Sequence, residues 1–337
     1  MEFRCPHEAL NSFQLLSIGS QDEENTKIGL TLLEETTKKL LEQTSYLPCI
    51  ECLKSIESII KDFNNINQQN NEILRNHESL KNIGKIIERL LSCPNITLEY
   101  SMISFSLIAQ LFYLSDILWL NGRYNFLKLL SSLCEVKLRV ILGDYKNICT
   151  NHVNDICDIV EGIIKEIEKG NLNDTIATDL SFSIQKCILF LCEWIYAIHK
   201  QNAIIIEDVE VRVYSLIIYF LYIGGGEILD KTNLKYALTP LQMISLRYIK
   251  KDYAKARSLI CVISCCPVLP DSTLEYLLNF TKEGIKLNHK EVIKDLCSIL
   301  DDFKDRCDYY DVKSLQELKK YAKSLNDCQL QEIVNSM

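Results

Sequence analysis

Apolar residues recur three and four positions apart along most of the chain, which is the spacing of one face of an α-helix. After Pro48, one set of positions is apolar (Ile50, Leu53, Ile56, Ile60) and the set between them is charged (Glu51, Lys54, Glu57, Lys61). This pattern predicts an amphipathic helix that packs on one side. The same pattern predicts helices over residues 24–43, 70–92, 98–120, 124–142, 151–169, 174–200, 208–223, 240–265, 272–287, 289–306, 312–324 and 327–334, about thirteen in all.

Proline and glycine residues stand where these helices should begin and end. They are Pro48 and Pro94 near helix starts, Gly122, Gly143 and Gly170 near helix ends, and the run Gly224–Gly226 after a very apolar helix. We interpret residues 224–226 as a hinge or turn. Two short runs, 203–206 and 209–222, are rich in β-branched and aromatic residues, so a strand pair is the alternative for 209–222.

The number of helices exceeds what one four-helix bundle can use, and a stacked array would bury their apolar faces. Pro48 and Pro94 lie 46 residues apart and each opens an apolar helix. This spacing resembles the paired-helix repeats of HEAT and armadillo proteins. Tyr248, Asp252, Tyr253 and Ala256, followed by Pro267, resemble part of a tetratricopeptide repeat instead. The resemblance implies an all-α, solenoid-like stack of antiparallel helices, although the intervals are not a constant 34 residues.

The chain contains no linker-like tract, since glycine is 11 residues and proline 6 of 337. We therefore expect one helical-repeat domain over 25–337, preceded by a peripheral segment over 1–24. Hydrophobic residues at 47% and charged residues at 24% predict a folded, globular chain. The hydrophobic share is high for an isolated solenoid, which suggests that another protein or a second copy of the chain covers one face.

Net charge and cysteine content limit the classes of function. A formal charge of −8 disfavours direct nucleic-acid contact, because binding to phosphates depends on Lys and Arg. Fifteen cysteines is an odd number, and because the first residues after Met1 lack the apolar segment of a signal peptide, we expect none. Cys187 and Cys192 fall on apolar stripes, as buried thiols of an intracellular protein do. We expect a cytoplasmic or nuclear protein. The apolar segment 101–120 carries Gln110 and Asp116, so we interpret it as a core helix and expect no membrane partner.

The strongest candidate for catalysis is the carboxylate run Asp301, Asp302 and Asp305. In a helical protein this motif resembles the Mg²⁺-binding motif of terpene and prenyl-diphosphate synthases, which implies an Mg-dependent enzyme as the alternative function. A second aspartate-rich motif is missing from the sequence. The apolar stripe of the same helix (Leu296, Leu300, Phe303, Cys307) points the three carboxylates toward solvent. We therefore expect no catalytic role.

Two cysteine groups have spacings that metal sites use. Cys49 and Cys52 form a Cys-x-x-Cys pair, and Cys149, His152 and Cys157 lie within nine residues. Neither group supplies the four ligands of a structural zinc site, so half-buried cysteines are the preferred interpretation and no cofactor is expected. The Gly224–Gly226 run lacks the Lys-Ser/Thr that follows a phosphate-binding loop.

The feature that favours binding is tyrosine, with 16 residues against 2 tryptophans. Four tyrosines are interleaved with basic residues near the glycine run, and we predict these eight as partner-binding residues for an acidic or aromatic peptide: Tyr222, Tyr236, Arg247, Tyr248, Lys250, Lys251, Tyr253 and Lys255. The predicted function is a non-catalytic protein-interaction scaffold or adaptor. A nucleic-acid-associated repeat protein that uses the basic stretch 247–257 is the second alternative.

Overall fold

The computed structural model describes residues 23–42, 47–66, 75–144, 147–201, 206–304, 312–325 and 327–337. Within these ranges the chain is helical and contains no strand, which confirms the all-α expectation. The alternative of a strand pair over 209–222 is wrong, since α10 (Glu207–Phe220) occupies this stretch. Residues 203–205 and almost all of the expected peripheral segment 1–24 lie outside the described residues.

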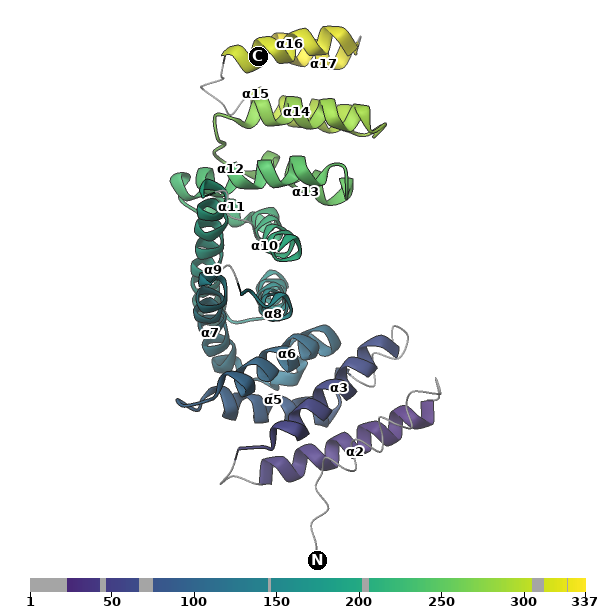
Figure 1. Cartoon of the computed structure of the whole chain (residues 1–337), viewed down its shortest axis with the longest axis vertical. Helices are drawn as coiled ribbons and strands as arrows, with labels where there is room; N and C mark the ends of the chain where they lie inside the picture. The colour runs from purple at the N-terminus through teal and green to yellow at the C-terminus, as the bar shows by residue number, and fades with distance from the viewer. Residues whose placement is uncertain are drawn as a thin grey trace, which may run out of the picture. The chain divides into compact units, whose positions relative to one another are not determined.

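The chain forms two compact units, residues 1–184 and 185–337, and their division falls within α9 (Asp174–Lys200). Among the described helices, α9 is the one that is long and apolar enough to cross a membrane, two criteria that the core helix of a soluble protein also meets. Each unit is a stack of helices, in which many helices pack on a helix that is not their direct neighbour in the chain (Figure 1).

Unit 1 contains α2 (Glu23–Glu42), α3 (Ile50–Ile66), α5 (Glu78–Leu91), α6 (Leu98–Ser115), α7 (Tyr124–Gly143) and α8 (Thr150–Glu168). One layer holds α2 packed on α5, and the other holds α3 on α6 and α6 on α8. Pro48 and Pro94 precede α3 and α6, which are neighbours in the second layer. Their spacing therefore reflects a repeat of the helix pair.

A short 3₁₀-helix, Leu118–Leu120, carries the largest core side chain of unit 1. Trp119 is fully buried and meets Phe112 and Phe126 edge to face, at centroid distances of 5.7 and 6.1 Å. Gly84 of α5 makes room for it, since a Cβ there would lie 2.6 Å from Cε3 of Trp119. Close approach of this kind fixes how α5 and the end of α6 pack.

Unit 2 contains the second half of α9, then α10, a π-helical turn (Leu221–Gly225), α11 (Gly226–Ile228), α12 (Lys231–Tyr248), α13 (Tyr253–Cys265), α14 (Thr273–Lys286), α15 (Val292–Lys304), α16 (Val312–Leu325) and α17 (Cys328–Ser336). The helices α12, α14 and α16 pack in succession, as do α13, α15 and α17. Gly224 has φ +98° in the kink after α10, a conformation that favours glycine.

The expected single helix over 240–265 is wrong, because two helices occupy this stretch. Pro240 lies inside α12 and does not begin it. The break falls at residues 249–252, where the side chain of Asp252 accepts a hydrogen bond from the Lys255 backbone N–H at 3.0 Å and caps α13. The apolar periodicity continues across this tight turn, which is why the sequence pattern concealed it.

Candidate functional site

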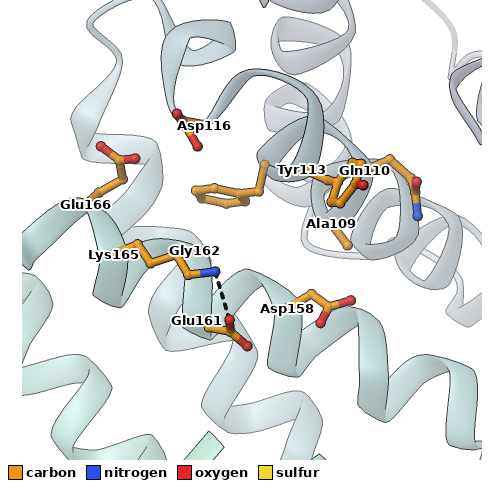
Figure 2. A pocket seen from close by; sticks show the side chains of 10 residues that line it. Ala109, Gln110, Tyr113, Asp116, Asp158, Glu161, Gly162, Lys165 and Glu166 are labelled. Carbon is orange, nitrogen blue, oxygen red and sulfur yellow. Dashed lines mark ion pairs between the residues drawn. The ribbon is translucent and has the colours of Figure 1, made fainter. Parts of the chain in front are cut away.

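A cleft of about 580 Å³ opens in unit 1 between α6 and α8 (Figure 2). Its walls come from the second half of each helix, and the lining residues are Ala109, Gln110, Phe112, Tyr113, Asp116, Asp158, Glu161, Gly162, Lys165 and Glu166. Residues later in α6 face residues later in α8, so the two helices run in the same direction. The cleft therefore lies between equivalent helices of consecutive repeats.

Glycine allows the two helices to approach at the floor of this cleft. A Cβ on Gly162 would lie 2.7 Å from Cδ1 of Phe112, a distance that packed side chains do not tolerate. Phe112 is buried and belongs to the aromatic core around Trp119. Tyr113, the next residue, is 68% exposed and lines the cleft. The floor is thus fixed by the core, while an aromatic side chain remains accessible.

Carboxylates dominate the cleft, with four acidic residues (Asp116, Asp158, Glu161, Glu166) and one lysine (Lys165) in its lining. Figure 2 shows Asp116 and Glu166 toward one end and Asp158 toward the other, with Lys165 paired to Glu161 at 2.8 Å. Lys169, just after α8, lies 2.6 Å from the buried Glu166 and 3.3 Å from Asp116. Burial would lower the pKa of Lys169, but its bonds to these two carboxylates raise it above the usual value.

A second cleft, of about 590 Å³, follows along the first halves of the same two helices and reaches α3. It is lined by Lys54, Glu57, Lys61, Glu99, Met102, Ile103, Ser106, Asn151, His152, Asn154 and Asp155. We call the linings of the two clefts together the α6–α8 groove. The groove as a whole holds seven carboxylates (Glu57, Glu99, Asp116, Asp155, Asp158, Glu161, Glu166) and three lysines (Lys54, Lys61, Lys165). Its net charge is negative.

One carboxylate of the groove has an unusual protonation equilibrium. Burial raises the pKa of Asp155 to about 6, and the negative charges of Asp158 and Glu57 act in the same direction. The positive charge of Lys61 opposes this shift. The single hydroxyl proton of Ser106 is donated to Glu57, at 2.6 Å, which ties α6 to α3. Carboxyl groups with raised pKa values in clefts are frequent at functional sites.

The eight predicted partner-binding residues all lie in unit 2, and the four basic ones face carboxylates there. Arg247 pairs with Glu210 at 2.6 Å, Lys251 with Glu207 at 2.6 Å, Lys250 with Glu283 at 3.7 Å and Lys255 with Asp252 at 3.8 Å. Arg257 also pairs with Asp295, at 2.6 Å. Most of these ion pairs join different helices of the stack, so the cluster is a ladder of ion pairs and offers little bare positive charge for phosphates.

The four predicted tyrosines have different surroundings. Tyr248 is buried, and the half-buried ring of Tyr253 stacks on His289 with centroids 3.6 Å apart. Tyr222 and Tyr236 are exposed, by 61% and 48%. Of the four, Tyr236 lines a groove, beside Tyr196. Tyr196 has no counterpart in the sequence prediction, because it lies on α9, forty positions before Tyr236.

The candidate catalytic and metal-binding residues do not come together in one site in the described part of the chain. Asp301 and Asp302 are exposed on α15, and Asp305 lies outside the described residues. Asp302 lines a shallow site with Glu227, Ser264, Cys265 and Pro267, a lining that offers no cation to a diphosphate. Cys157 is buried in the core, whereas Cys149 is exposed at the start of α8 and His152 lines the groove. No group of three His, Cys, Asp or Glu among the described residues is arranged to hold a metal ion.

No protein-family model matches this chain, and no curated protein matches it either. Two of the solved structures that match it cover most of this chain at low sequence identity. An engineered protein matches 98% of this chain and 87% of its own length, with 11% identity and a TM-score of 0.45. A circular tandem repeat protein with a novel repeat topology matches 97% of this chain and 74% of its own length, with 12% identity and a TM-score of 0.28.

The class of this protein follows from how its own helices pack. Within each unit, helix pairs stack so that equivalent helices contact one another, which is the architecture of an α-helical solenoid. The chain is therefore a helical-repeat protein. Its repeats are irregular, since the first helices of successive pairs begin at Glu23, Glu78, Tyr124, Asp174, Lys231, Thr273 and Val312.

Proposed function

We propose that this chain is a non-catalytic scaffold that binds a segment of a partner protein in the α6–α8 groove. The observation that carries the proposal is the groove itself, two acidic clefts in succession between equivalent helices, with the exposed Tyr113 on the wall of the first. Stacked repeats create such surfaces, and extended segments or helices of other proteins occupy them.

The charge of the groove favours a partner segment that carries lysine or arginine. Guanidinium and ammonium groups form charge-assisted hydrogen bonds with carboxylates, and an aromatic ring such as Tyr113 adds apolar area and a face for a cation. Complementary charge also speeds encounter and selects among partners. We propose an intracellular protein partner, in the cytoplasm or nucleus, in keeping with the many buried thiols.

The enzymatic alternative has weaker support. Asp301 and Asp302 are exposed, and the shallow site that Asp302 lines contains a second carboxylate, Glu227, and no basic side chain among the described residues. A prenyl-diphosphate enzyme needs cations and an enclosed, dry cavity for its reaction. Turnover of prenyl diphosphates with Mg²⁺ that is lost in Asp301→Asn/Asp302→Asn would favour this alternative over the scaffold.

Affinity capture of the tagged full-length chain from its native cells, with mass spectrometry of the co-purifying proteins, tests the scaffold proposal. The test variant is Asp158→Lys/Glu161→Lys, which reverses two charges of the groove. The matched control is Glu35→Lys/Glu42→Lys on α2, where both residues are exposed and outside the groove. We expect a stoichiometric partner with wild type and control that is lost with the groove variant. A chain that comes down alone, as a monomer, contradicts the proposal.

A further inference from the structure

A separate groove lies in unit 2, on the face where α12 meets the loop between α13 and α14. Its volume is about 640 Å³, within the range of ligand sites. Its lining includes Tyr196, Lys231, Lys235, Tyr236, Val268 and Pro270, together with one carboxylate, Asp271. We call this site the Tyr–Lys groove. All of it belongs to residues 185–337, and it shares no residue with the α6–α8 groove.

An aromatic pair forms the apolar part of the Tyr–Lys groove. Tyr196 and Tyr236 meet edge to face, with ring centroids 5.0 Å apart and an interplanar angle of 67°. This contact holds the Tyr236 ring in place while almost half of the side chain stays exposed. Val268 and Pro270 add aliphatic surface to the lining. Rigid, half-exposed tyrosines are characteristic of recognition surfaces because little entropy is lost when they bind.

Positive charge lies next to this apolar surface. Lys231 and Lys235 are one helical turn apart on α12, both exposed. Lys235 pairs at 3.4 Å with Asp271, which is 88% exposed, so water screens this pair strongly. No ion pair is recorded for Lys231 within the described residues. The nearest carboxylate in sequence, Asp230, instead caps α12 by accepting from the Thr232 and Asn233 backbone N–H groups at 2.9 Å.

We infer that the Tyr–Lys groove binds an acidic segment of a partner protein. One or two Asp or Glu side chains pair with Lys231 and Lys235, and a neighbouring apolar or aromatic side chain packs between Tyr236 and the Val268–Pro270 wall. Two lysines match a short acidic motif, whereas nucleic-acid affinity rises with the number of phosphates neutralised. This site goes beyond the proposed function, because it takes a segment of opposite charge on the other unit.

Selection from a phage-displayed library of random 12-residue peptides tests the inference with the full-length chain. Enriched peptides are synthesised with a fluorescent label, and their affinity is measured by fluorescence polarisation on four proteins. These are wild type, Lys231→Glu/Lys235→Glu, Tyr236→Ala, and the control Lys286→Glu/Lys290→Glu, which makes the same charge change on exposed lysines outside the groove. Thermal unfolding of each variant verifies its fold.

One family of enriched peptides should combine Asp or Glu with an aromatic or large aliphatic residue. Its affinity should fall at least about tenfold in the lysine variant and several-fold in Tyr236→Ala, and stay unchanged in the control. The inference is wrong if no acidic family is enriched, or if its affinity is the same on all four proteins. It is also wrong if a labelled oligothymidylate loses affinity in the Lys231→Glu/Lys235→Glu variant while the acidic peptides keep theirs. The peptide affinities are independent of the capture experiment, which tests the α6–α8 groove, so failure of one proposal can be distinguished from failure of the other.

Discussion

The α6–α8 groove of unit 1 and the Tyr–Lys groove of unit 2 are built on the same repeat architecture but differ in how they open. The first lies between two parallel helices that approach closely at Gly162, and carboxylates line it along its length. The second lies where one helix meets an inter-repeat loop, and an aromatic pair with two lysines lines it. In both cases the packing of the repeats forms the groove, and a few surface side chains determine whether the groove favours a basic or an acidic ligand.

The largest expected difference between the two grooves comes from Gly162, which lies at the floor of the α6–α8 groove. Gly162→Ala places a Cβ 2.7 Å from the Phe112 ring, so we expect a loss of about 2 kcal/mol in the free energy of unfolding. Binding of the basic partner segment should weaken, and acidic peptides should bind unit 2 as before. Urea denaturation and fluorescence polarisation measure the two effects.

Gly143→Ala is the matched control, because nothing lies within 4 Å of a Cβ at that helical position. Alanine lowers the conformational entropy of the unfolded chain, so the free energy of unfolding of Gly143→Ala should be unchanged or slightly higher than that of wild type. Equal losses for the two alanine variants would show that close approach of α6 and α8 does not define the groove.

The raised pKa of Asp155 in unit 1 gives a pH dependence of stability opposite in sign to that of the lowered pKa of Glu210 in unit 2. A carboxyl group with a folded pKa of about 6 and an unfolded pKa near 3.8 stabilises the fold fully below pH 3.8, and this contribution is lost as the pH rises to 6. Asp155→Asn removes the charge, so the variant should be more stable than wild type at pH 7 by on the order of 2 kcal/mol.

Urea denaturation at pH 4, 5, 6 and 7 should show this difference between variant and wild type shrinking toward pH 4. A difference that is the same at every pH would mean that Asp155 is not a buried, titrating carboxyl group. Asp208→Asn on α10 is the control for the change of side chain, since Asp208 is exposed and is not among the charges that act on Asp155.

A smaller effect distinguishes structural from binding roles in the ion-pair ladder of unit 2. Among the described residues, Arg247→Met leaves the buried Glu210 with one ion-pair partner, His199 at 3.2 Å, and should cost about 1 kcal/mol of stability. Lys251→Met breaks an exposed pair with Glu207 and should change stability by less than about 0.5 kcal/mol.

Neither change in the ladder should alter peptide binding to the Tyr–Lys groove. Fluorescence polarisation with the selected acidic peptides measures this. Weaker binding in either variant would show that the ion pairs of Arg247 or Lys251 contribute to partner binding, as the sequence predicted.

The sequence predicted the helices well because their apolar faces are periodic. It predicted poorly where structure depends on residues from distant helices. The stretch 247–257 is basic in sequence, yet its charges meet Glu207, Glu210, Glu283 and Asp295, which only the packing brings near. The α6–α8 groove was not predicted, since it is formed by helices from different repeats, and of the Tyr–Lys groove only Tyr236 was among the predicted partner-binding residues. Tyr236 was predicted from composition, whereas its partner Tyr196 carried no sequence signal.

Hydrogen–deuterium exchange on the captured complex tests the central claim most directly. With the partner bound, we predict slower exchange in two stretches far apart in sequence, residues 109–116 of α6 and 158–166 of α8, and the same rates as the free chain on α2. Protection confined to other helices, or no protection in these two stretches, would contradict the account.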